Sequence, residues 1–136
     1  MLKLPIECWS GKLNKIIVAL LASTLSLLAL NFHTYDEARA LQQKSGKIIM
    51  IDVIRTNCHY CSDMQKEVFD DTEMSKWLEK RFIPVKINLD FDELPLGLSV
   101  YFTPTFFFVN TKEQIVKKIP GSWNIKDFKD LTKDIK

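Results

Sequence analysis

The sequence contains few residues that could bind a metal ion. There are three Cys and two His among its 136 residues, and only Cys58 and Cys61 lie close together in the chain. Beyond residue 30, only His33 and His59 could add a nitrogen ligand to this pair. Because a structural zinc site normally needs four Cys, His or carboxylate ligands, the sequence argues against a zinc domain.

The sequence also lacks low-complexity tracts, solenoid-length repeats and a large excess of either charge. Its 46% hydrophobic and 26% charged residues are typical of a folded globular protein. The net charge is +2, and residues 31–136 carry 16 basic and 16 acidic side chains. Proteins that bind nucleic acids usually carry a basic stripe that meets the phosphates. We therefore expect no nucleic-acid partner.

One long hydrophobic run, residues 16–30, follows Lys12 and Lys15. A short apolar run after positive charges is typical of a secretory signal, whereas a membrane span usually needs about 20 apolar residues. The run is not amphipathic, so it fits a buried core helix poorly. We expect residues 1–31 to be a signal peptide or an N-terminal membrane anchor. Residues 32–136 would then form one periplasmic or otherwise extracytoplasmic domain, secreted or anchored to the membrane. A small-x-small cleavage pattern at residues 38–40 is discounted because it lies inside the first expected helix.

The pattern of apolar and turn residues predicts alternating helices and strands. Residues 47–54 are mostly apolar and β-branched without alternation, which indicates a strand buried on both faces. The expected elements are, in chain order, helix 35–44, strand 47–54, helix 58–68, helix 70–81, strand 83–89, a short helix within 90–101, strands 105–109 and 115–119 as a hairpin, and helix 124–135. This order predicts an α/β domain in which helices flank a mixed sheet.

Cys58 and Cys61 form a C-x-x-C motif between a predicted strand and a predicted helix, a position typical of a redox-active pair. The free N–H groups and the dipole of a helix N-terminus stabilise a thiolate and lower its pKa. Cys58 is therefore the candidate nucleophile. Cys61, one helical turn later, could attack the mixed disulfide that Cys58 forms with a substrate.

Other interpretations of the two cysteines stay open at this point. A structural disulfide is disfavoured because closing so small a loop removes little entropy from the unfolded chain. Zinc or copper binding needs additional ligands near the pair. Two inert buried thiols are the third alternative.

Four further features follow in an order that resembles the thioredoxin superfamily. Asp52 lies in the first core strand, Lys86 lies in the second, Thr103 and Pro104 precede the hairpin, and Gly121 follows it. The segment 67–74, with the Trp and Phe residues that follow it, is most similar to small envelope-targeted thioredoxin-like proteins of bacteria. The resemblance covers roughly residues 35–135. It implies a thioredoxin fold with a mixed four-stranded sheet.

The resemblance also implies roles for individual residues. Cys58 and Cys61 would form a redox-active disulfide. Asp52 and Lys86 would accept and relay the proton of Cys61, and a cis peptide bond before Pro104 would place the Thr103 backbone against the substrate.

The motif departs from the family pattern Trp-Cys-Gly-Pro-Cys, since this chain reads Asn57-Cys58-His59-Tyr60-Cys61. His59 and Tyr60 are expected to face the substrate, and His59 is expected to lie in solvent at the start of the helix. Because these residues differ from the family pattern, the substrate and the reduction potential cannot be carried over.

These features together predict a thiol:disulfide oxidoreductase that reduces protein disulfides outside the cytoplasm without a cofactor or metal. A soluble or membrane-bound thiol donor would restore its dithiol. We expect a reductase or isomerase and not a strong oxidant, with a reduction potential between about −270 and −180 mV. The alternative is a thioredoxin-fold copper chaperone or a non-enzymatic interaction module.

Overall fold

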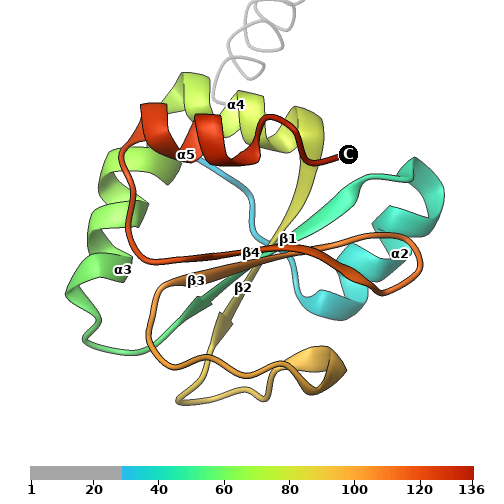
Figure 1. Cartoon of the computed structure of the whole chain (residues 1–136), viewed down its shortest axis with the longest axis horizontal. Coiled ribbons are helices and arrows are strands. Elements are labelled where there is room, and N and C mark those ends of the chain that lie inside the picture. The colour runs from blue at the N-terminus through green and yellow to red at the C-terminus, as the bar shows by residue number, and fades with distance from the viewer. Residues whose placement is uncertain (1–28) are drawn as a thin grey trace, which may run out of the picture.

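The computed structural model describes residues 29–136 of the chain (Figure 1). Most of the hydrophobic run, with its predicted role as signal or anchor, lies outside the described residues. Among residues 29–136, no helix is long and apolar enough to cross a membrane.

A four-stranded mixed sheet forms the centre of the domain, as the sequence predicted. Its strands are β1 (Ile48–Ile54), β2 (Phe82–Asn88), β3 (Thr105–Val109) and β4 (Ile115–Pro120), in the spatial order β2-β1-β3-β4. β1 pairs parallel with β2 and antiparallel with β3, which pairs antiparallel with β4. Because β1 and β2 are parallel, their C-terminal ends lie side by side at the same end of the sheet. The predicted site residues follow or lie near these ends.

Helices cover both faces of this sheet (Figure 1). On one face lie α3 (His59–Met64), the π-helical turn η1 (Gln65–Phe69), α4 (Thr72–Arg81) and α5 (Ile125–Thr132); α2 (Tyr35–Ser45) and the short 3-10 turn η2 (Pro95–Gly97) lie on the other side. Each face has its own apolar cluster. Phe69 of η1, Leu78 of α4 and Phe128 of α5 belong to the cluster on one face. Ala38 of α2 belongs to the cluster on the opposite face.

Polar side chains cap the N-termini of α2, α4 and α5. Thr34 and Glu37 form a reciprocal capping box at the start of α2. Asp71 accepts the Met74 N–H at the start of α4, and Asn124 accepts the Asp127 N–H at the start of α5. The predicted helix 70–81 therefore begins two residues later, at Thr72, because Asp71 is its cap.

The chain before α2 is packed into the domain. Leu30 is buried in the apolar core, and its N–H donates to the Phe69 carbonyl. His33 forms a bridge with Val85 along the outer edge of β2. The packed domain therefore reaches back at least to Leu30. The triplet at residues 38–40 lies inside α2, as expected.

Candidate redox site

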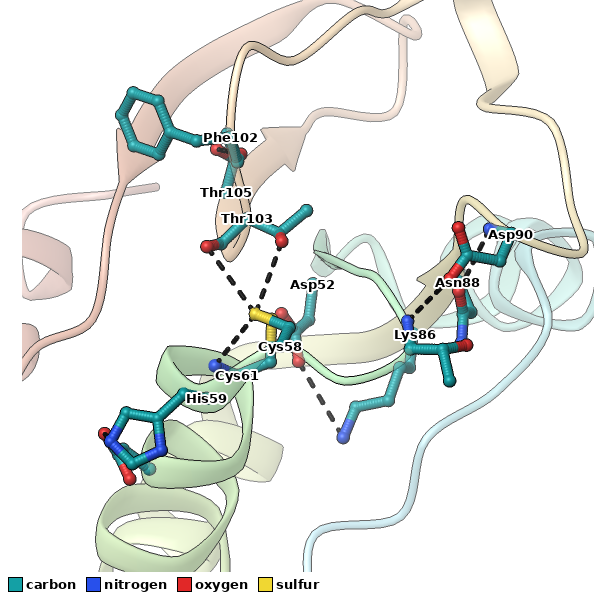
Figure 2. The surroundings of a disulfide bond; sticks show 12 residues. Asp52, Cys58, His59, Cys61, Lys86, Asn88, Asp90, Phe102, Thr103 and Thr105 are labelled. Carbon is teal, nitrogen blue, oxygen red and sulfur yellow. Dashed lines mark hydrogen bonds and ion pairs between the residues drawn. A yellow bond between two sulfur atoms is a disulfide. The ribbon is translucent and has the colours of Figure 1, made fainter.

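The two cysteines lie at the junction between the sheet and α3. Cys58 is the N-cap residue of α3, and its Sγ is bonded to that of Cys61 in a disulfide (Figure 2). The Cys61 N–H also donates to Cys58 Sγ at 3.2 Å. The sulfur of Cys58 therefore occupies the place of a capping oxygen, where a helix N-terminus stabilises negative charge.

A tight reversal connects β1 to this cap. Asn57 has φ 57°, in the left-handed region, immediately before Cys58. Asn adopts this region more easily than most residues with a Cβ atom. The family's Trp at this position is absent, and a residue suited to a left-handed turn takes its place.

The segment before β3 approaches Cys58 from the other side. The peptide bond between Thr103 and Pro104 is cis. The Thr103 hydroxyl donates to Cys58 Sγ at 3.3 Å, and the Thr103 carbonyl oxygen lies 3.6 Å from the same sulfur (Figure 2). Gly121, with φ 93°, donates its N–H to the Pro104 carbonyl at 2.8 Å. This bond ties the turn to the end of β4.

Asp52 and Lys86 face each other across paired positions of β1 and β2, as expected. Asp52 Oδ2 lies 3.8 Å from Lys86 Nζ, and the Asp52 residue is only 2% exposed. Burial raises the pKa of Asp52 to about 7, although the Lys86 charge opposes this shift. Among the described residues, no group donates a hydrogen bond to Asp52 Oδ1. A buried carboxyl that titrates near neutral pH is suited to proton transfer.

Lys86 also contacts Gln65 and two aromatic rings, contacts that the sequence did not predict. Its Nζ donates to Gln65 Oε1 and lies 3.9 Å from the ring centroid of Phe32, with Phe69 farther away at 5.7 Å. Such cation–π contacts attract an ammonium group to the ring face. Burial lowers the pKa of Lys86. Phe32 could not be assigned this contact from sequence, since the contact depends on the chain running along the edge of β2.

His59 and Tyr60 are both exposed beside the disulfide. The His59 side chain is 83% exposed and its Nε2 lies 3.3 Å from Asp63 Oδ2, one turn later. Tyr60 is 64% exposed. The expectation that His59 lies in solvent is confirmed. A groove of about 560 Å³ passes the disulfide and is lined by residues that include Arg55, Gln65 and Lys86.

Asn88 and Asp90, which no sequence motif marks, hold the loop before Cys58. Asp90 Oδ2 accepts the Thr56 N–H at 2.8 Å, and Asn88 Nδ2 donates to the Thr56 hydroxyl at 3.2 Å. The available signal was two polar residues at the end of the predicted strand 83–89, Asn88 within it and Asp90 directly after it. No cluster of three or more His, Cys, Asp or Glu side chains that could hold a metal occurs within residues 29–136.

The thioredoxin-like domain family matches residues 35–136 of this chain. The chain belongs to this family. Among solved structures, a thioredoxin from Thermus thermophilus superposes with a TM-score of 0.66 and 29% identity, covering 79% of this chain and 87% of that one. Poplar thioredoxin h superposes with a TM-score of 0.58 and 22% identity, covering 73% and 86%.

A curated relative, human spermatogenesis-associated protein 20, is 35% identical over 69 residues. These residues are 51% of this thioredoxin-like chain and 8% of the human protein, so the chain spans only a small part of that relative.

The fold, the family and the cysteine pair together define the chemistry. The thioredoxin-like domain carries a C-x-x-C pair at disulfide distance, with its first sulfur at a helix N-terminus and beside Thr103. This domain has the redox site of a thiol:disulfide oxidoreductase. Thioredoxin-fold oxidoreductases act on protein disulfides and draw electrons from a thiol donor.

Proposed function

We propose that this protein is a reductase of protein disulfides that works outside the cytoplasm. The observation that carries this proposal is the position of Cys58 Sγ. It caps α3 through the Cys61 N–H and also lies within 3.3 Å of the Thr103 hydroxyl. A thiolate held there is stabilised on one side, and the backbone of Thr103 lies where an extended substrate chain can pass.

The reaction begins with the reduced pair. The Cys58 thiolate attacks one sulfur of the substrate disulfide, forms a mixed disulfide and displaces the other substrate sulfur as a thiolate, which takes up a proton. Cys61 loses its proton and attacks Cys58 Sγ, which releases the second substrate thiolate. The products are a reduced substrate and the Cys58–Cys61 disulfide. A thiol donor then reduces this disulfide by the same exchange in reverse.

Asp52 serves the second step as the acceptor of the Cys61 proton. Its pKa near 7 allows it to accept a proton at neutral pH and to lose it again. Lys86, 3.8 Å away, stabilises the ionised form of Asp52. Asp52 is buried, whereas Cys58 Sγ contacts Thr103, and we therefore assign the attack on the substrate to Cys58 and the release of the product to Cys61.

The surface around the disulfide suits a protein substrate. Tyr60, between the cysteines, is 64% exposed, and Phe102, next to Thr103, is 56% exposed. Exposed aromatic side chains of this kind contribute contact area to apolar partner segments. Thr103 offers backbone groups to the substrate chain.

The direction of electron flow depends on how much further stabilisation the Cys58 thiolate receives beyond the helix N-terminus and Thr103. His59 is exposed and pairs with Asp63, so solvent and a neighbouring carboxylate reduce its field at Cys58. The crossover from β1 to β2 contains only α3, η1 and α4, without the inserted helical domain of the strong oxidants. Both features favour a reductase.

The location outside the cytoplasm is supported by the sequence of the N-terminal segment. Residues 16–30 form an uncharged apolar run after Lys12 and Lys15. The thiol donor then works on the same side of the membrane, either as a soluble protein or as part of a membrane protein.

Insulin reduction with dithiothreitol as the electron donor tests the reductase proposal. The wild-type chain should accelerate precipitation of the insulin B chain, and Cys58→Ser should abolish the acceleration. Cys61→Ser should accumulate mixed disulfides that separate into substrate and enzyme on a reducing gel. Cys8→Ser serves as the matched control and should retain the wild-type rate. Mixed disulfides that form through Cys61 in the Cys58→Ser variant would overturn the assignment of the nucleophile.

A further inference from the structure

The loop that presents Cys58 is fastened to the chain that follows β2. β1 and β2 are parallel, and their C-terminal ends lie side by side. The Leu89 N–H donates to the Ile54 carbonyl at 3.0 Å, which extends the pairing one residue beyond the strands. Residues 55–57 therefore lie directly beside residues 88–90.

The Asp90 carboxylate makes the central contact between these two segments (Figure 2). Its Oδ2 accepts the Thr56 N–H at 2.8 Å, and its Oδ1 lies 3.8 Å from Arg55 Nη1. The hydrogen bond from Thr56 holds the pKa of Asp90 below its ordinary value, so this side chain is ionised at neutral pH. A hydrogen bond from a backbone N–H to an ionised carboxylate is stronger than a neutral one.

Asn88 completes the contact and orients Asp90. Asn88 Oδ1 accepts the Asp90 N–H at 3.0 Å, and Asn88 Nδ2 donates to the Thr56 hydroxyl at 3.2 Å. Thr56 is therefore held through its backbone by one side chain and through its hydroxyl by the other. Two residues later the chain reaches the cap of α3.

The held loop contains the backbone conformation on which the cap depends. Asn57 adopts φ 57°, and Cys58 then takes an extended conformation that directs Sγ toward the Cys61 N–H. A left-handed residue with a Cβ atom persists only where the surrounding contacts hold it. Among the described residues, the side-chain contacts on the loop that precedes it come from Asp90 and Asn88.

We propose that Asp90 is a positioning residue for disulfide exchange, which holds the loop at Thr56 so that the Cys58 thiolate stays at the N-terminus of α3. Asp90 does not touch the substrate or the sulfurs in this role. The inference rests on thiol chemistry at Cys58 and not on the reductase direction proposed above.

Charge and position predict opposite effects for Asp90→Ala. Removing a nearby negative charge would favour the Cys58 thiolate and lower its pKa. Releasing the loop would move the sulfur away from the helix N-terminus and raise its pKa. The sign of the change therefore distinguishes a positioning role from a Coulomb effect.

The experiment measures iodoacetamide alkylation of Cys58 against pH in the full-length chain. A Cys61→Ser background and mass spectrometry of the Cys58 peptide isolate this thiol. For Asp90→Ala, we expect a raised Cys58 pKa and alkylation about two- to fivefold slower at pH 7, the size of a typical helix-terminus effect. Asp90→Asn keeps an oxygen acceptor for Thr56 and should restore the wild-type profile. Asp92→Ala, an exposed acid two residues later, is the matched control and should leave the profile unchanged.

Two results would overturn the positioning role. One is an unchanged or lowered Cys58 pKa in Asp90→Ala, and the other is an Asp90→Asn profile as altered as that of Asp90→Ala. If Asp90→Ala does not fold, Asn88→Ala tests the same contact and should raise the Cys58 pKa by a smaller amount. Failure of the wild-type chain to reduce insulin would reject the proposed reductase function but would leave these alkylation profiles interpretable.

Discussion

At the scale of single residues, the most informative group is the buried carboxyl of Asp52. Burial raises its pKa to about 7, while Lys86 acts in the opposite direction without cancelling the effect. A group in this state is unfavourable for stability and useful for proton transfer. Both consequences can be measured with one substitution.

The catalytic consequence is a pH-dependent loss of rate in Asp52→Asn. Without this proton acceptor, Cys61 must ionise unaided, and a Cys thiol has an ordinary pKa of about 8.5. We expect insulin reduction to slow by about tenfold or more near pH 6 to 7 and to approach the wild-type rate near pH 9. Asp130→Asn, on the exposed side of α5, is the control. Equal rates for wild type and Asp52→Asn at every pH would leave Asp52 with no role in exchange.

The consequence for stability has a defined sign. Because the folded-state pKa of Asp52 lies above the ordinary value of 3.8, the folded protein binds more protons than the unfolded chain between about pH 4 and 7. Stability therefore falls as the pH rises through this window. Asp52→Asn removes this dependence. The free energy of unfolding of the variant, relative to that of wild type, should therefore rise from pH 4 to pH 8 by up to about 4 kcal/mol. Urea denaturation of the oxidised proteins at both pH values measures the difference, and a constant difference would contradict a raised pKa.

At the scale of elements, the site is assembled by two turns that approach Cys58 from opposite sides. Residues 55–57 hold the cysteine at the start of α3, and residues 103–104 bring Thr103 to its sulfur. Gly121 holds this second turn in place, because its N–H donates to the Pro104 carbonyl.

Gly121→Ala should therefore affect both stability and exchange. At φ 93°, an Ala residue is strained by about 1–2 kcal/mol, and relief of the strain would disturb the bond to Pro104. Gly46→Ala is the matched control, since Gly46 has φ 71° and lies at the end of α2. Both variants should lose stability in urea denaturation, but only Gly121→Ala should slow insulin reduction. A similar loss of rate in both would show that general stability, and not the turn, limits the reaction.

The sequence predicted most elements because their local signals agree with the fold. The unbroken apolar run of β1 and the cap at Asn124 are readable from sequence alone, whereas the start of α4 was placed two residues too early. Helix 58–68 was predicted, but not the π-helical geometry of its last turn, η1. Its residues contact distant parts of the chain, since the Leu30 N–H donates to the Phe69 carbonyl and the Lys86 ammonium donates to Gln65.

The redox residues of the site were predicted more completely than the residues that hold them in place. Cys58 could be placed from its C-x-x-C motif, and Asp52 and Lys86 from the resemblance to the thioredoxin superfamily, which the strand register agrees with. Asp90 and Phe32 could not be assigned roles, because a short-range pattern does not reveal which loop lies beside the end of another strand. Their contacts depend on the register of β1 against β2 and on the path of the chain before α2.

At the scale of the whole molecule, the proposed location can be tested by a topology reporter. A reporter that is active only after export, fused after Lys136, should be active in cells if residues 16–30 direct the domain across the membrane. The control lacks residues 1–28 and should be inactive. An inactive reporter on the full chain, with the protein recovered from the cytosol, would reject the extracytoplasmic location while leaving the redox chemistry intact.

The reduction potential of the Cys58–Cys61 pair tests the proposed reductase most directly. Potentials in this superfamily extend from about −270 mV in thioredoxin to about −120 mV in the strongest periplasmic oxidant. Equilibration of the full-length chain with glutathione at known ratios, followed by alkylation and mass spectrometry, gives the value for this pair. Because His59 is exposed and pairs with Asp63, and because only α3, η1 and α4 lie between β1 and β2, we expect a potential between about −270 and −180 mV. A potential above about −150 mV would contradict the account and reverse the assigned direction of electron flow.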